Sequence, residues 1–221
     1  MATHLDEQEQ LEDIKHFWKR WGTLITGVIT VVLLAFAAWN GWSWWQRDQA
    51  AKAGVLYDEV ERAAQAGDAQ KAERAFSDMR ERYGRTAYAE QAGLLAARVL
   101  HDKGENEKAE AALAWVGDNA REAEYRAIAR LRRAALLLER KAYDEALKLT
   151  EGVPAQFEAL AADRRGDILR AQGQLDQARA AYQKAWAAMP ATQDYRQLVE
   201  AKLTALGAAP AAADAASGAA R

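Results

Sequence analysis

Hydrophobic positions along the chain follow one pattern before Arg47 and another after it. Residues 21–46 carry no charged side chain, and residues 23–38 (TLITGVITVVLLAFAA) are almost entirely apolar. At about 1.5 Å per residue, a helix over residues 21–42 is roughly 33 Å long, which matches a hydrocarbon core of about 30 Å. The pattern predicts one transmembrane helix, with bounds 21–45.

Tryptophans flank this apolar stretch at both ends. Six of the eight tryptophans of the chain lie within the first 45 residues. Indole rings prefer the membrane interface, so two groups one bilayer apart are typical of aromatic belts. The predicted interface anchors are Trp18, Trp21, Trp39, Trp42, Trp44 and Trp45.

Two other readings of residues 21–46 remain open, a buried core helix and a cleaved signal peptide with Ala35-Phe36-Ala37 as its cleavage box. An uncharged core helix of this length is unusual, and the preceding twenty residues carry five acids, unlike a short basic signal region. We therefore expect an uncleaved anchor, preceded by an acidic cytoplasmic segment (1–20). Residues 11–21 are expected to form an interfacial helix that leads into the span. Three basic residues before the span and two after it favour a cytoplasmic N-terminus.

The rest of the chain repeats a turn followed by an alanine. Four segments align, GDAQKA (67–72), GENEKA (104–109), KAYDEA (141–146) and GQLDQA (173–178). Their last alanines are 37, 37 and 32 residues apart. Each turn separates two alanine-rich helical patterns, in which a small alanine permits close helix crossing. Pairs of this kind bury their apolar faces only by stacking on neighbouring pairs.

These repeats predict an all-α fold, a solenoid of helix hairpins over residues 46–206 behind one transmembrane helix. Residues 192–206 are expected to form a terminal capping helix. The alanine-rich tail, residues 207–221, is expected to be disordered.

The last repeat closely resembles a tetratricopeptide repeat (TPR). Gly166 and Leu169 match the small and large positions of its first helix, whereas Ala178, Tyr182 and Pro190 match its second helix and closing proline. The third repeat departs most, since Lys141 replaces the turn glycine and Thr150 replaces the aromatic. The residues expected to pack the repeats are Ala72, Phe76, Ala109, Leu113, Ala146, Gly166, Ala178 and Tyr182.

The whole layout resembles the YfgM-like family, the ancillary subunit of the bacterial SecYEG translocon. The resemblance covers residues 5–206 and depends on an acidic N-terminal segment, one anchor, a TPR domain and the AxxRGDxLxxxG stretch. It implies a protein of the bacterial inner membrane with a periplasmic TPR domain. It also implies two protein partners, the translocon and a membrane-anchored periplasmic isomerase-type chaperone.

Composition gives no support to catalysis. The chain has no cysteine, and its three histidines lie far apart, so neither thiol chemistry nor a metal site is expected. Walker A, GxGxxG and Gly-x-Ser-x-Gly motifs are absent. The net charge of -2 offers no basic surplus for nucleic acid. We predict a protein that is not an enzyme and that needs no cofactor.

Two sets of polar residues are candidates for partner contacts. Arg126, Arg130 and Arg133 share one helical face and could clamp a carboxylate, or could simply be a solvated face over apolar neighbours. The repeat alignment also predicts a polar groove along the first helices. Its residues are Asp58, Glu61, Arg98, His101, Asp163, Asp167 and Arg170.

These expectations together describe a membrane-anchored TPR scaffold at the secretion machinery, assisting the biogenesis of secreted or envelope proteins. Two alternatives stay open on sequence grounds. One is a periplasmic chaperone that holds unfolded clients, and the other is a TPR adaptor for cell-envelope or division complexes.

Overall fold

The computed structural model describes residues 3–190 and 192–209; for residues 3–14, 16 and 17 it describes the helical backbone only. The described residues form nine α-helices and one short 3-10 helix, with no strand among them. The chain divides after Ala51 into two compact units. The all-α prediction is therefore confirmed.

Helix α1 runs from Thr3 to Gln65 without a break, and its residues up to Ala51 make up the first unit. This helix holds an 18-residue window with a mean hydropathy of 2.1, long and apolar enough to cross a membrane. Two of its polar side chains bond to backbone carbonyls of their own helix, as a lipid environment favours. Thr30 Oγ1 donates to Thr26 O at 2.8 Å, and Asn40 Nδ2 donates to Phe36 O at 2.9 Å.

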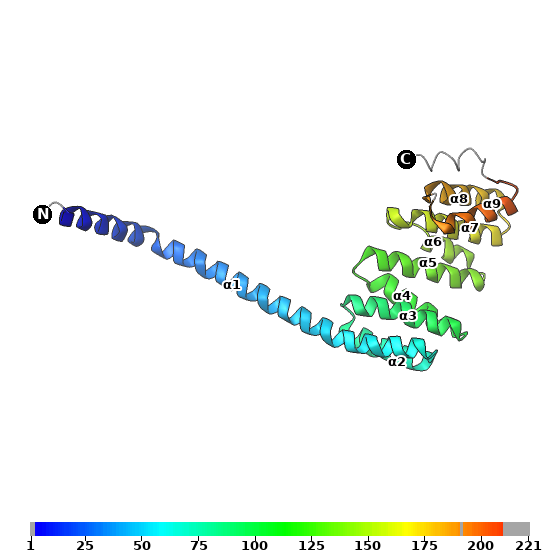
Figure 1. The fold of residues 1–221 in the computed structure, drawn as a ribbon, viewed down its shortest axis with the longest axis horizontal. Helices are drawn as coiled ribbons and strands as arrows, with labels where there is room; N and C mark the ends of the chain where they lie inside the picture. The colour runs from blue at the N-terminus through cyan, green and yellow to red at the C-terminus, as the bar shows by residue number, and fades with distance from the viewer. Residues whose placement is uncertain (1–2, 191, 210–221) are drawn as a thin grey trace. The chain divides into compact units, whose positions relative to one another are not determined.

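The second unit begins at Lys52 and consists of helix hairpins, which Figure 1 shows stacked in chain order from α2 to α9. Helix α3 pairs with α4, α5 with α6, and α7 with α8. The end of α1 shares a core cluster with α2, in which Val60 and Ala63 join Ala69 and Ala72. Helix α9 follows as a single helix on the last pair. The bounds are α2 Ala69–Tyr83, α3 Ala87–Asp102, α4 Asn106–Asn119, α5 Ala123–Glu139, α6 Tyr143–Leu149, the 3-10 helix η1 Ala155–Phe157, α7 Glu158–Ala171, α8 Leu175–Ala188 and α9 Asp194–Ala205.

All four turns within the hairpins share one backbone geometry. Gly67, Gly104, Lys141 and Gly173 have φ angles of 63°, 80°, 64° and 81°. In each turn, the amide of the next residue donates to the carbonyl five residues earlier, as from Ala142 N to Leu137 O at 2.8 Å. This is the Schellman arrangement, in which a left-handed residue ends the helix. Among the described residues, Lys141 is the one non-glycine with a positive φ.

Small residues let the two helices of a hairpin approach closely. Ala72, Ala109, Ala146 and Ala178 are each the fourth residue of a second helix, and each is fully buried. Gly166 of α7 lies against the Tyr182 ring, since a Cβ there would be 2.4 Å from Tyr182 Cε1. The other residues expected to pack the repeats, Phe76, Leu113 and Tyr182, are buried as well.

The third hairpin is shorter than the others. Helix α6 has 7 residues, whereas the second helices of the other hairpins have 14 or 15. The hydrophobic core is divided at this point. A cluster of four fully buried side chains, Ala134, Leu137, Ala146 and Ile168, lies between the larger core of α1–α5 and that of α7–α9.

The predicted domain bounds compare with the structure as follows. The expected transmembrane helix 21–45 lies within the longer α1, which also includes the segment expected to be an interfacial helix. The second unit begins at residue 52, whereas the repeat domain was expected from residue 46. Most of the alanine-rich tail, residues 210–221, lies outside the described residues.

Candidate protein-binding surface

The tryptophans predicted as interface anchors all lie on α1 and are exposed. Trp18 and Trp21 lie at one end of the apolar stretch, and Trp39, Trp42, Trp44 and Trp45 lie at the other. The Trp42 and Trp45 rings contact each other, with centroids 5.2 Å apart. Their function as interface anchors stays a prediction.

The first helices of the hairpins bring three tyrosines together in the second unit. Tyr57 of α1 and Tyr88 of α3 have ring centroids 5.7 Å apart. Gln91, one helical turn after Tyr88, donates from Nε2 to the Tyr125 hydroxyl of α5 at 2.8 Å. Burial raises the pKa of Tyr57, and the nearby Glu61 and Tyr125 add to the increase.

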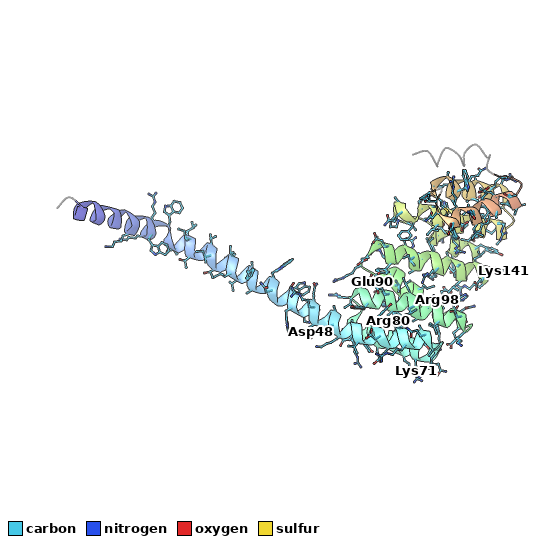
Figure 2. The ribbon with its side chains drawn as sticks, in the orientation of Figure 1. Asp48, Lys71, Arg80, Glu90, Arg98 and Lys141 are labelled. Carbon is cyan, nitrogen blue, oxygen red and sulfur yellow. The ribbon has the colours of Figure 1, made fainter. Side chains whose placement is uncertain are left out.

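Two arginines continue the same helix faces. Arg98 lies seven residues after Gln91 on α3, and Arg132 lies seven residues after Tyr125 on α5, a spacing of two turns that places each pair on one face of its helix. Both side chains are exposed, and Figure 2 labels Arg98. The surrounding protein partly desolvates the guanidinium of Arg132 and so lowers its pKa, and the positive charge of Arg98 lowers it further. We call Tyr57, Tyr88, Gln91, Arg98, Tyr125 and Arg132 the first-helix face.

The predicted groove residues fall into two groups. Asp58, Glu61, Arg98 and Arg170 are exposed on first helices. His101 is half-buried at the end of α3, where its Nδ1 lies 2.8 Å from Asn106 Oδ1 of α4 and its Nε2 lies 4.0 Å from Glu139 of α5. His101 thus joins three helices of the stack.

Asp163 and Asp167 lie in the interface between α7 and α9. Asp163 is 1% exposed, accepts a hydrogen bond from the Tyr195 hydroxyl at 2.7 Å and pairs with Lys202 at 2.7 Å. Asp167 accepts from the Tyr182 hydroxyl at 2.8 Å and pairs with Lys202 at 2.9 Å. The prediction that these two carboxylates line an open groove is wrong, because α9 covers them.

Arg126, Arg130 and Arg133 contact their own domain. Arg126 donates to the carbonyls of Ala120 and Arg121 at 2.7 and 2.9 Å. Arg130 donates to Lys148 O and Glu151 O at 3.2 and 2.7 Å. Arg133 pairs with Glu110 at 3.3 Å. The three guanidinium groups that could have bound a partner's carboxylate are therefore already paired, with backbone carbonyls or with Glu110.

Two cavities flank the segment that follows α6. One, of about 330 Å³, lies over α7 and α8 and includes Thr150, Arg165 and Lys184 in its lining. The other, of about 280 Å³, lies beside α4 and α5 and includes Arg126, Arg130 and Pro154. The short α6 leaves these spaces, since a longer second helix would continue past Thr150. Within the described part of the chain, no group of His, Asp or Glu could hold a metal ion.

Sequence reasoning missed most of the first-helix face. The signal was available, because Tyr88 and Tyr125 are 37 residues apart, which is also the spacing of Ala72 and Ala109. Two aromatics at one repeat period occupy equivalent positions in consecutive hairpins and therefore lie on the same side of the stack.

Comparisons with known proteins agree with this architecture. Residues 15–208 match the family described as the tetratricopeptide repeat-like domain. The ancillary SecYEG translocon subunit of Neisseria gonorrhoeae is 32% identical over 208 residues, a match that covers 93% of this chain and 100% of that protein.

Solved structures with the same fold include a MamA double mutant, with a TM-score of 0.55 and 20% identity, covering 76% of this chain and 90% of that one. MamA from Desulfovibrio magneticus RS-1, residues 41 to the end, has a TM-score of 0.53 and 21% identity with the same coverage. These likenesses concern the fold. The matched domain and the full-length relative place the chain in the YfgM-like family of ancillary SecYEG translocon subunits, whose members carry a tetratricopeptide repeat-like domain.

Proposed function

We propose that this protein is an inner-membrane subunit associated with the Sec translocon, where its repeat domain binds protein partners. The observation that carries the proposal is the 32% identity to an ancillary SecYEG translocon subunit, because that match includes the apolar stretch as well as the repeats. The exposed surfaces of the second unit are sufficient for binding protein partners, and the proposal involves no reaction.

The apolar part of α1 serves as the membrane anchor in this proposal. Its exposed tryptophans lie at the two ends of the apolar stretch, as interface anchors do, and support this assignment. The basic residues before the span favour a cytoplasmic N-terminus, which puts the repeat domain in the periplasm. Anchoring raises the effective concentration of the repeat domain near membrane partners.

The proposed partners are SecYEG and a membrane-anchored periplasmic isomerase-type chaperone. With both partners bound to one anchored domain, a secreted protein would meet the chaperone directly after translocation. The repeat domain acts here as a scaffold, and its contribution is binding alone.

Purification from membranes tests this function. The full chain with a C-terminal tag is isolated in mild detergent, and the bound proteins are identified by mass spectrometry. We expect SecY, SecE and SecG together with a periplasmic isomerase-type chaperone. A matched control carries the tag directly after Ala51 and lacks the second unit. Translocon subunits missing from the full-chain eluate would contradict the proposal.

Protease access in spheroplasts tests the orientation separately. With a cytoplasmic N-terminus, externally added protease digests the repeat domain while the membrane remains intact. A protected repeat domain that becomes sensitive only after lysis would refute the periplasmic placement.

A further inference from the structure

We propose that the loop between α2 and α3 binds the anionic phospholipid headgroups of the membrane in which α1 is anchored. The residues concerned are Arg80 and Arg82 in the last turn of α2 and Arg85 in the loop, and we call them the basic corner. The inference rests on the proposed function, in that the apolar part of α1 is the membrane anchor. It adds a second membrane contact, made by the repeat domain.

The positive charge of the basic corner is not used within the repeat domain. All three side chains are exposed, and Figure 2 labels Arg80. None of them forms an ion pair or a side-chain hydrogen bond with any residue that the structure describes. Residues 80–86 hold these three arginines and one acid, Glu81. From residue 52 onward the chain has 26 basic and 26 acidic residues, so the corner is a local positive patch in a neutral sequence.

The helix dipole does not account for this charge. Basic residues in a last turn complement the negative end of a helix, and α2 has two of them there. Helices α4 and α8 are also second helices of hairpins, yet neither has a basic residue in its last turn. The charge is therefore specific to the first hairpin and is not a general property of the repeat.

The later loops between hairpins carry the opposite charge. Residues 118–124, around the loop between α4 and α5, include three acids and one arginine. Residues 150–158, between α6 and α7, include two acids and no basic residue. All these loops lie at the end of the hairpins opposite the four left-handed turns, because each hairpin reverses the chain. An anionic membrane attracts the first loop and repels the later ones.

The basic corner is also the loop that the chain ties most closely to the anchor. Tyr88, at the start of α3, has its ring centroid 5.7 Å from that of Tyr57, and a Cβ on Gly54 would lie 3.6 Å from the Tyr88 ring. Nine residues separate Gly54 from Trp45, the last predicted interface anchor. Nine residues reach at most about 32 Å even when fully extended. The covalent chain therefore limits how far the basic corner can lie from the headgroups.

The arrangement of the arginines favours a lipid surface over a single small anion. Arg80 and Arg82 point about 200° apart around α2, since each residue turns a helix by about 100°. Such side chains do not converge on one phosphate ion, whereas a bilayer offers a separate headgroup to each. Arginine pairs with phosphate oxygens through two N–H groups at once. Nucleic acid fits less well, because its phosphate backbone requires a longer basic stripe.

Fluorescence quenching in reconstituted vesicles tests the inference. The chain has no cysteine, so one introduced cysteine takes a bimane label at a single position. Ala87→Cys places the label beside the basic corner, and Gln70→Cys places it at the opposite end of α2. The labelled full chain is inserted into vesicles of phosphatidylcholine with or without phosphatidylglycerol, and both contain equal amounts of a lipid with a nitroxide quencher on its headgroup. We expect phosphatidylglycerol to increase quenching at position 87 and to change it little at position 70.

Removal of the three charges should abolish the additional quenching. Each basic residue near an anionic membrane raises the population in contact by a factor of about five, so three together contribute about a hundredfold. The triple variant Arg80→Gln, Arg82→Gln, Arg85→Gln should therefore give the same quenching in both kinds of vesicle. About 1 M salt should have the same effect on the wild type, because the Debye length falls to about 3 Å.

The matched control makes the same change in net charge at three exposed positions on later first helices, Arg98→Gln, Arg132→Gln and Arg170→Gln. This control should retain the additional quenching at position 87. Equal quenching of the wild type in the two kinds of vesicle, or the same loss in the control as in the corner variant, would overturn the inference.

The outcomes separate this inference from the proposed function. A chain that a carbonate wash removes from the vesicles would overturn the anchor and this inference with it. A chain that stays in the vesicles without responding to lipid charge would overturn this inference alone. If the corner variant lost SecYEG on purification while its quenching stayed at the wild-type level, the arginines would bind the translocon and not the lipid. Additional quenching with no SecYEG in the wild-type eluate would support the basic corner and refute the proposed partner.

Discussion

The ammonium group of Lys202 lies 2.7 Å from the carboxylate of Asp163, and this ion pair joins the last helix to the last hairpin. Asp163 is 1% exposed, and Lys202 also lies 2.9 Å from Asp167. Lys202 thus pairs with two carboxylates at once, and Arg164, 3.5 Å from Asp167, adds a second positive charge to the cluster. The terminal helix is therefore held by charge as well as by the buried Val199 and Leu203.

Replacement of Lys202 by methionine should destabilise the repeat domain by about 3 kcal/mol, because it leaves Asp163 buried without its counter-charge. Chemical denaturation of the full chain in detergent, followed by circular dichroism at 222 nm, measures the change. Asp163→Asn in the Lys202→Met background should recover part of the loss, because it removes the uncompensated charge. Equal stability of Lys202→Met and wild type would contradict this account of α9.

Alkaline pH should weaken the contact between α7 and α8. Burial raises the pKa of Tyr182, and its hydrogen bond to Asp167 raises it further. The unfolded chain releases this proton near pH 10, about the ordinary tyrosine value, whereas the folded chain retains it. The stability that protonated Tyr182 contributes is therefore complete below about pH 10, and it is lost as the pH rises above that value.

Unfolding of wild type and Tyr182→Phe in a series of alkaline buffers measures this effect. The variant should lose less stability between about pH 9 and pH 11 than wild type does. Tyr143→Phe, outside the cluster, should follow the wild-type curve. Identical slopes for Tyr182→Phe and wild type would exclude Tyr182 as the source.

Two glycines in helices should respond to alanine in opposite ways. Gly166→Ala places a Cβ 2.4 Å from the Tyr182 ring, which should destabilise the domain by about 2 kcal/mol. Gly117→Ala in α4 meets no atom closer than 3.5 Å, and the reduced freedom of the unfolded chain should stabilise the domain by about 0.5 kcal/mol. The midpoint of thermal unfolding, measured for both variants and wild type, tests this prediction. Midpoints that shift in the same direction for both variants would be inconsistent with this packing.

Lys141→Gly should stabilise the third hairpin. Lys141 has a φ of 64°, a left-handed conformation that costs a lysine about 1 kcal/mol and glycine very little. The converse change, Gly173→Lys, places a side chain in open space, so the same backbone cost alone should destabilise the domain. Denaturation midpoints of both variants provide the measurement. A destabilised Lys141→Gly would show that the lysine side chain has a role beyond the turn.

The hairpin turns and the close helix crossings were predictable because they depend on local chemistry. Every hairpin has a left-handed residue at its turn and an alanine as the fourth residue of the next helix. The repeat alignment assigned Lys141 to the turn position that glycine holds in the other hairpins, and its φ is positive there. The repeat spacing also hinted at the short α6, since Ala146 and Ala178 are 32 residues apart where the other intervals are 37.

The polar contacts between helices were not predictable in the same way. Register along a first helix shows which side chains point away from their own hairpin, but not whether another helix then covers them. Asp163 was for this reason assigned to open surface, although α9 buries it. Glu90 is a similar case, since it is 2% exposed and accepts a hydrogen bond from Arg121 N at 2.8 Å across the stack.

The short α6 also determines how the repeat domain responds to force. In an array held together by contacts between neighbouring hairpins, unfolding begins where those contacts are fewest. The four-residue cluster at α6 is the smallest of the three buried hydrophobic clusters, and a larger cluster lies on each side of it. Tension applied to the domain would therefore extend the chain at residues 150–157 first, while the helices around the two larger clusters keep their structure.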